Sequence, residues 1–208
     1  MRSTLLTWRR SKTSEATPRR SALIVIDVQE SFRQMPNWWD VDLPAFKAAV
    51  LDLERVAREA GVAVVHVFHV GKAGPFKKDS GFVRPLDWLR DGPDVVFEKH
   101  THNAFTDTGL DLWLRRRQID HLVITGIRTE QCCKTTTRVA SDIGYSVDYV
   151  TDATLTFPMI HAGTSREYSP AEIKAYTELV LRDRFARIAS VVVRADAARA
   201  DARLRWAG

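Results

Sequence analysis

Apolar runs alternate with amphipathic segments along most of the chain. Residues 21–27, SALIVID, are apolar for five positions before Asp27, a pattern typical of a strand buried on both faces of a parallel sheet. Residues 42–61 repeat apolar side chains at helical spacing, with Pro44 near the first turn and Gly61 at the end, which predicts a helix. Further strands are predicted at 62–70, 94–99, 121–127, 145–150 and 186–193, and further helices at 106–118, 129–144 and 169–185.

Strands that alternate with helices predict an α/β fold of three layers, α/β/α, around a mainly parallel, roughly six-stranded, Rossmann-like sheet. A chain of 208 residues, 45% of them hydrophobic, is long enough for one sizeable core. We expect that domain at 21–193, a basic tail at 1–20, and a tail or helix at 194–208. Residues 71–93 are rich in Gly, Pro and Lys and predict a mostly irregular rim or lid, with one short helix at 86–90.

The amino-acid composition limits the kinds of partner and surroundings expected for this protein. The 31 Lys and Arg against 26 Asp and Glu give a formal charge of +5, but the excess lies at the two ends of the chain, which argues against a nucleic-acid surface on the folded body. No apolar run approaches the roughly 20 residues that span a bilayer. Two adjacent cysteines cannot form a disulfide framework, so a reducing, cytoplasmic location is expected.

Three predicted strands lead to residues that can react. The first ends at Asp27, another ends at Lys99, and the strand at 121–127 leads to Cys132 and Cys133. The carboxyl ends of parallel strands share one edge of a sheet, so a carboxylate, an ammonium and a thiol could meet there. Each also has an ordinary structural interpretation: Asp27 as a helix cap, Lys99 as a solvated side chain, the cysteines as small buried hydrophobes.

The two thiols are not equivalent. With Thr129 as the N-cap of the helix at 129–144, Cys132 lies in the first turn, where the helix dipole favours a thiolate. Cys132 also shares an apolar face with Thr136, Val139, Ala140 and Ile143, and that face should lie on the sheet. Cys133 is turned about 100° away, at the border of this face, and is expected to pack.

Three blocks of sequence resemble the signature of a known family, the isochorismatase-like cysteine hydrolases. They are ALIVIDVQESF, EKHTHNAFTDTGL and LVITGIRTEQCCKTTTRVASDIGYSVDYVTDAT. The family includes nicotinamidases, N-carbamoylsarcosine amidohydrolases, and ureidoacrylate and biuret hydrolases, and the resemblance extends over about residues 21–192. It implies that Asp27, Lys99 and Cys132 form a catalytic triad.

The resemblance implies further features. A cis peptide would join Ile127 to Arg128, and the backbone N–H groups of Arg128 and Cys132 would form the oxyanion site. Metal-binding family members carry an Asp-x-His element that this sequence lacks, and no cofactor motif is present, so neither a metal nor an organic cofactor is expected. The resemblance also implies a homo-oligomer, a dimer or tetramer.

The substrate pocket is less well specified. Phe32 and Trp38 follow the first strand, and Phe105 lies on the loop after Lys99, so all three are expected to wall the pocket; Trp38 could instead be a core or subunit contact. The sequence as a whole indicates a metal-independent cysteine hydrolase that cleaves a small amide or other C–N bond through a thioester. The alternatives are isochorismatase-type vinyl-ether hydrolysis without a covalent thiol, and a non-catalytic interaction protein or thiol sensor.

Overall fold

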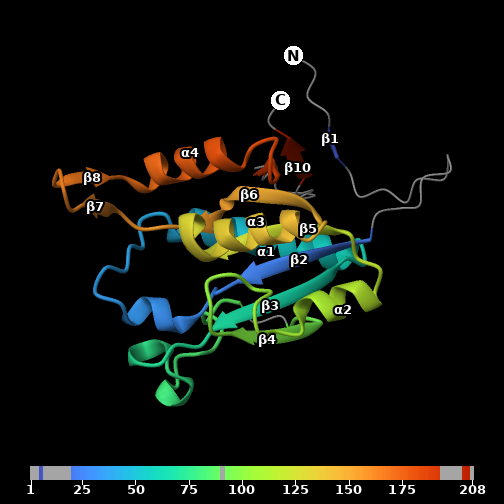
Figure 1. Ribbon diagram of the computed structural model, residues 1–208, viewed down its shortest axis with the longest axis horizontal. Coiled ribbons are helices and arrows are strands. Elements are labelled where there is room, and N and C mark those ends of the chain that lie inside the picture. The colour runs from blue at the N-terminus through green and yellow to red at the C-terminus, as the bar shows by residue number, and fades with distance from the viewer. Residues whose placement is uncertain (1–4, 7–19, 90–91, 193–202, 207–208) are drawn as a thin grey trace.

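The computed structural model describes residues 5–6, 20–89, 92–192 and 203–206. Its centre is an eight-stranded sheet in the order β1-β10-β9-β6-β5-β2-β3-β4 (Figure 1). The six strands from β9 to β4 are parallel, and β10 and β1 extend the sheet in antiparallel pairing. The strands are β1 (Leu5–Leu6), β2 (Ser21–Ile26), β3 (Ala63–His69), β4 (Val95–Lys99), β5 (His121–Ile127), β6 (Ser146–Leu155), β9 (Arg187–Val192) and β10 (Arg203–Trp206).

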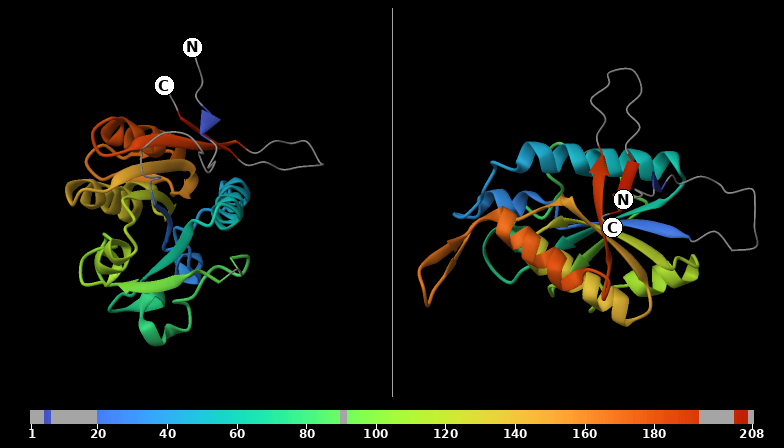
Figure 2. Two further views of the ribbon diagram at one scale, coloured as in Figure 1. Left: turned by 90° about the vertical axis from the view of Figure 1, so that its right-hand side faces the viewer. Right: turned by 90° about the horizontal axis from the view of Figure 1, so that it is seen from above.

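Helices cover both faces of the sheet, which confirms the predicted three-layer α/β fold. Helix α1 (Leu43–Glu59) lies on one face, and α2 (Leu110–Arg116), α3 (Lys134–Asp142) and α4 (Pro170–Leu181) lie on the other (Figure 2). Among the described helices none is both long and apolar enough to cross a bilayer. Shorter elements are the 3₁₀-helices η1 (Glu30–Gln34), η2 (Gly74–Phe76) and η3 (Lys78–Ser80), the π-helical turn η4 (Thr129–Cys133), and the hairpin strands β7 (Met159–His161) and β8 (Arg166–Tyr168).

The apolar face of α1 packs on the sheet and forms one of the two core layers. Phe46, Val50 and Leu53, spaced at helical intervals, are buried against the β2 side chains Leu23 and Val25. On the opposite face, alternate β2 side chains pack with the apolar residues of α2, α3 and α4. A sheet buried on both faces needs continuously apolar strands, which is why β2 and β5 could be predicted from their apolar runs.

The ends of the chain differ from expectation. Leu5–Leu6 lies in the segment expected to be a basic tail and Arg203–Trp206 in the one expected to be a tail or helix, yet both are strands. The sequence RLRW alternates polar and apolar residues, a strand signal that outweighs the helical interpretation. Residues 193–202 and most of 1–19 lie outside the described part, as does the expected domain boundary at 193.

Two internal segments also differ. In the described part of 71–93 the helical turns lie at Gly74–Phe76 and Lys78–Ser80, and residues 86–89 form no helix. The β7–β8 hairpin was not predicted. Its three-residue strands are too short for a periodic pattern to stand out in the sequence.

Candidate active site

The three predicted catalytic residues meet at the carboxyl edge of the parallel sheet. Asp27 directly follows β2, Lys99 is the last residue of β4, and Cys132 lies in η4, which follows β5. Strands β4, β3, β2 and β5 are neighbours in that order, so the side chains of Asp27, Lys99 and Cys132 converge on one point. Asp27 and Lys99 are fully buried, and Cys132 is 6% exposed.

Lys99 connects the other two side chains. Its Nζ lies 2.8 Å from Asp27 Oδ2 and 3.4 Å from Cys132 Sγ. It also donates a hydrogen bond of 3.1 Å to the carbonyl oxygen of Thr101 and lies 3.4 Å from Nδ1 of His69. A buried ammonium needs such partners to remain charged, and here it is held between the carboxylate and the thiol.

The backbone places Asp27, and Lys99 is the ionic partner of its carboxylate. Its φ angle of 54° lies in the left-handed region, where a non-glycine residue turns the chain sharply, and its N–H donates to the carbonyl of Val67 at 2.7 Å. Neither carboxylate oxygen has an aligned hydrogen-bond donor among the described residues, although Oδ2 forms the ion pair with Lys99. Such buried oxygens are rare in folded proteins, and these can accept a proton.

The surroundings favour a protonated thiol at rest. Burial, followed by the negative charge of Asp27, raises the pKa of Cys132 to about 12, and the nearby Lys99 charge only partly opposes this. Burial lowers the pKa of Lys99, but the charges of Asp27 and Cys132 outweigh burial and raise it. Burial and the charge of Lys99 lower the pKa of His69, so this imidazole is neutral near pH 7.

The turn that carries the cysteines differs in detail from the expected helix start. The helical segment begins at Thr129 as a π turn, so Arg128 and not Thr129 is the flanking residue, and α3 begins only at Lys134. Thr129 donates its hydroxyl to Thr154 Oγ1 at 2.8 Å and caps nothing. Single π turns occur frequently at functional sites. The peptide bond between Ile127 and Arg128 is cis.

The two cysteines are both buried, but of the two only Cys132 lines the active-site cavity. Cys132 Sγ lines the active-site cavity and lies 4.0 Å from His102 Nδ1. Cys133 is fully buried in the core. Ile143, expected on the buried face of the helix, is exposed, and α3 ends just before it.

The active-site cavity has a volume of about 350 Å³, which suits a small molecule. Of the residues expected to wall it, Phe32 does so. Trp38 instead packs on Phe157 at 5.4 Å between ring centroids, and Phe105 stacks on Tyr145 at 5.8 Å. The lining residues are Asp27, Phe32, Met35, Asn37, His69, Gly71, Ala73, Phe76, His102, Arg128, Gln131, Cys132 and Phe157.

Several lining residues were not found from the sequence. Gly71, Ala73 and Phe76 come from the irregular region expected to be a rim, whereas Lys77 in the same loop pairs with Asp79 at 2.8 Å. Phe157 follows β6, which is longer than the strand predicted at 145–150. The apolar residues after 150 were the available signal, since extending that strand brings Phe157 to the reactive edge.

Two histidines, His66 and His102, lie in different parts of the structure. His66 Nε2 is 2.6 Å from Glu54 Oε1 in the core, and His102 lines the cavity. Within the described residues, no three His, Cys, Asp or Glu side chains are grouped so that they could hold a metal ion.

Comparison with known proteins identifies the family. The chain matches the model of the Isochorismatase domain over residues 21–190. The isochorismatase family protein YrdC of Bacillus subtilis (strain 168) is 28% identical over 177 residues, which cover 81% of this chain and 91% of that protein. Nicotinamidase 3 of Arabidopsis thaliana is 29% identical over 153 residues, 66% of this chain and 74% of that protein.

Solved structures agree with this result. A candidate isochorismatase from Burkholderia xenovorans LB400 is 34% identical and superposes with a TM-score of 0.75, over 84% of this chain and 85% of that one. The family model covers the part of the chain that contains Asp27, Lys99 and Cys132. The chain therefore belongs to the isochorismatase family of hydrolases.

Proposed function

We propose that the protein hydrolyses a small amide or related C–N bond through a covalent thioester on Cys132. The observation that carries this proposal is the convergence of three buried groups, with Lys99 Nζ 2.8 Å from Asp27 and 3.4 Å from the thiol. A carboxylate, an ammonium and a thiol beside a small cavity are the groups that nucleophilic catalysis at a carbonyl requires. The nicotinamidase relative supports an amide as the substrate class.

In the first half-reaction Asp27 takes the thiol proton as substrate binds. The thiolate attacks the carbonyl carbon, and the carbonyl oxygen becomes an oxyanion. Lys99 and the backbone N–H groups of Arg128 and Cys132 stabilise the negative charge. The C–N bond then breaks, the departing nitrogen receives the proton from Asp27, and an acyl thioester remains on Cys132.

Water completes the cycle. Asp27, again a carboxylate, takes a proton from a water molecule that attacks the thioester carbonyl. Collapse of this second tetrahedral species breaks the C–S bond, and the Cys132 thiolate is reprotonated by Asp27. The products are a carboxylic or carbamic acid and an amine or ammonia. Each step uses groups that lie in or directly behind the cavity.

The test is a screen for ammonia release over small amides, carbamoyl compounds and ureides, with mass spectrometry of protein quenched during turnover. We expect an acyl adduct on Cys132 and no activity in Cys132→Ala. We also expect Asp27→Asn and Lys99→Ala to lower kcat by at least about a hundredfold, as the loss of a general acid–base or charge-stabilising group does. Circular dichroism of each variant checks that it folds.

Other outcomes would favour other functions. An adduct on Cys133, or near-normal turnover in either Asp27→Asn or Lys99→Ala, would contradict the proposed roles. Hydrolysis of a vinyl ether that survives in Cys132→Ala would indicate chemistry without a covalent thiol. A thiol sensor that uses the adjacent cysteines is less well supported, because Cys133 is fully buried and so poorly accessible to oxidants.

A further inference from the structure

The side chain of Arg128 is an unexplained charge in the active-site cavity. Arg128 follows β5 directly and stands four positions before Cys132. It lines the same cavity as the thiol, with only 11% of its side chain exposed. Arginine is seldom this deeply buried unless its guanidinium is paired or used. The proposed reaction uses only the backbone N–H of Arg128, so the side chain needs a separate account.

The guanidinium is held in place, but its Nε and Nη2 groups have no aligned hydrogen-bond acceptor among the described residues. Its Nη2 lies 3.1 Å from Glu130 Oε1, yet the two atoms are not aligned as a hydrogen bond. Its Nε is buried without an acceptor among the described residues. The ring of Phe157 lies against the guanidinium, with 4.9 Å from Cζ to the ring centroid, a stacking geometry that fixes its plane.

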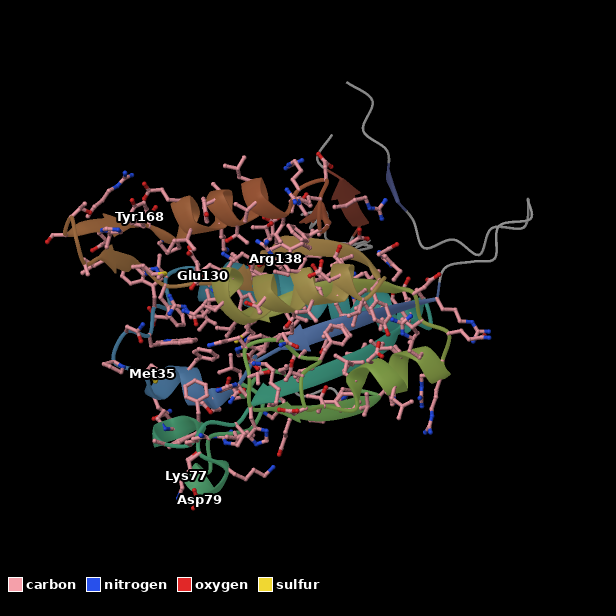
Figure 3. All side chains as sticks on the ribbon, in the orientation of Figure 1. Met35, Lys77, Asp79, Glu130, Arg138 and Tyr168 are labelled. Carbon is pink, nitrogen blue, oxygen red and sulfur yellow. The ribbon has the colours of Figure 1, made fainter. Side chains whose placement is uncertain are left out.

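Glu130 stands behind Arg128 relative to the active-site cavity. Its other oxygen accepts a hydrogen bond of 2.6 Å from Thr156 Oγ1. Glu130 does not line the active-site cavity but a neighbouring hollow that it shares with Tyr168 of β8; Figure 3 shows Glu130 between Tyr168 and the cavity residue Met35. Glu130 therefore pairs with the guanidinium from outside the active-site cavity, and no described residue accepts an aligned hydrogen bond from Nε or Nη2.

The charges of the cavity favour an anion at this position. The charged side chains that line it are Asp27 and Arg128, and His69 is neutral near pH 7 because its pKa is lowered. The negative charge of Asp27 is already balanced by Lys99 at 2.8 Å. The amide side chains of Asn37 and Gln131 also line the cavity and can donate further hydrogen bonds. Apart from Asp27, the charged side chain on the cavity wall is the cation Arg128, whose ionic partner Glu130 does not line this cavity.

We infer that Arg128 binds a carboxylate carried by the substrate, so that the preferred substrates are small amides or ureides with an anionic end. This inference rests on the proposed function and names its substrate class. A planar guanidinium with free N–H groups binds carboxylates with paired, charge-assisted hydrogen bonds. Because the guanidinium and Cys132 Sγ share a cavity of about 350 Å³, the carboxylate and the scissile carbonyl are only a few bonds apart in such a molecule.

The test compares ligands that differ in charge but not in size. Succinamate is paired with succinamide, and N-carbamoylglycine with N-carbamoylglycinamide. Binding is measured by calorimetry on the Cys132→Ala protein, which cannot turn the ligands over, and kcat/KM is measured on the wild type. We expect the anionic member of at least one pair to bind about tenfold or more tightly than its neutral partner, as a charge-assisted hydrogen bond provides.

Variants connect this preference to one residue. In the Cys132→Ala background, Arg128→Gln should abolish the preference for the anion by weakening the anionic member more than the neutral one, whereas Arg128→Lys should keep part of the preference. Arg138→Gln is the matched control, since Arg138 is an exposed arginine on α3 that stacks on Phe185. It removes the same charge and should keep the full preference.

The possible results are distinguishable. Equal or better binding of the neutral members, no binding in either pair, or a preference that survives in Arg128→Gln would overturn the inference. Equal weakening of both members by Arg128→Gln would overturn it as well and would show that the residue only shapes the cavity. Anion-selective binding without turnover on any amide would contradict the proposed hydrolysis and leave the carboxylate site standing.

Discussion

At the scale of single residues, the charges around Cys132 decide when its thiolate forms. Asp27 has two opposite effects on the thiol: its negative charge raises the pKa of Cys132, and its carboxylate can take the proton. The free enzyme should therefore keep an inert thiol and generate the nucleophile only when substrate fills the cavity. A thiol that is protonated at rest is also poorly reactive toward oxidants and alkylating agents.

The Asp27→Asn variant should separate these two effects. Removing the carboxylate charge while Lys99 remains must lower the pKa of Cys132 from about 12. At a given pH more thiolate is then present, roughly tenfold for each unit by which the pKa falls. We expect iodoacetamide to alkylate Cys132 faster in Asp27→Asn than in the wild type over about pH 7 to 10, although Asp27→Asn has lost turnover.

The measurement is the alkylation rate as a function of pH, with the modified cysteine identified by mass spectrometry. Lys99→Met is the matched control, because removing the positive charge should raise the pKa of Cys132 and slow its alkylation. Equal or slower alkylation in Asp27→Asn would show that the charge of Asp27 does not govern the thiol.

At the scale of elements, the sequence predicts best what depends on burial of whole strands. Asp27 and Lys99 could be placed because each stands at the end of a predicted strand, and parallel pairing brings such ends together. The position of Phe157 was missed, because β6 passes through Thr151, Asp152 and Thr154, polar residues that interrupt the apolar pattern after 150. Thr154 is satisfied within the fold, since its hydroxyl donates to the carbonyl of Thr151 and accepts from Thr129, and the strand continues through it.

The side chain of Arg128 shows a different limit of prediction. Nothing in the local sequence tells whether it points into the cavity or outward, since its orientation depends on Phe157, which is distant in sequence, and on Glu130. The expected N-cap at Thr129 was wrong for a related reason. Its hydroxyl bonds to Thr154 across the sheet, a tertiary contact that competes with local capping.

The junction between β5 and the cysteine turn depends on Gly126. This residue has φ of 132°, and a Cβ added to it would lie 2.0 Å from the carbonyl oxygen of Ile26, the residue before Asp27. Gly126→Ala should therefore push β5 from β2, lower the free energy of unfolding by about 3 kcal/mol or more, and separate Cys132 from Asp27. Urea denaturation and kcat/KM measure the two effects.

Gly144→Ala is the control for backbone strain alone. Gly144 also has a positive φ, 97°, but a Cβ there would meet nothing within 4 Å. We expect Gly144→Ala to lower the free energy of unfolding by about 1–2 kcal/mol, the penalty for a side chain in a left-handed conformation. The variant should keep kcat/KM unchanged. Similar losses in both glycine variants would show that the contact with Ile26 is unimportant.

At the scale of the whole molecule, the site and the terminal strands occupy different parts of one sheet. The reactive edge is formed by β2, β4 and β5, whereas β10 and β1 lie beyond β9 at the far side of the sheet (Figure 1). Catalytic activity should therefore not depend on the pairing of β1 and β10 at the far side of the sheet. The homo-oligomer and the cytoplasmic location stay predictions.

Truncation tests this separation. A chain that ends at Val192 lacks β10, which pairs with β9 over four residue positions. At about 1 kcal/mol for each net hydrogen bond, we expect the free energy of unfolding to fall by about 2–4 kcal/mol. The exposed edge of β9 should also promote aggregation, which light scattering detects. The turnover number should stay within about twofold of the full chain, because distant sites contribute independently.

A chain that begins at residue 20 provides the comparison. It lacks β1, which contributes only two paired positions, Leu5 with Arg205 and Leu6 with Leu204, at the outermost edge of the sheet. Terminal pairs of this kind open with little cost, so we expect a smaller loss of stability than truncation at Val192 causes. If removing β10 lowers kcat as strongly as it lowers stability, then the far edge of the sheet helps to hold the Asp27, Lys99 and Cys132 geometry, and site and edge are one cooperative unit.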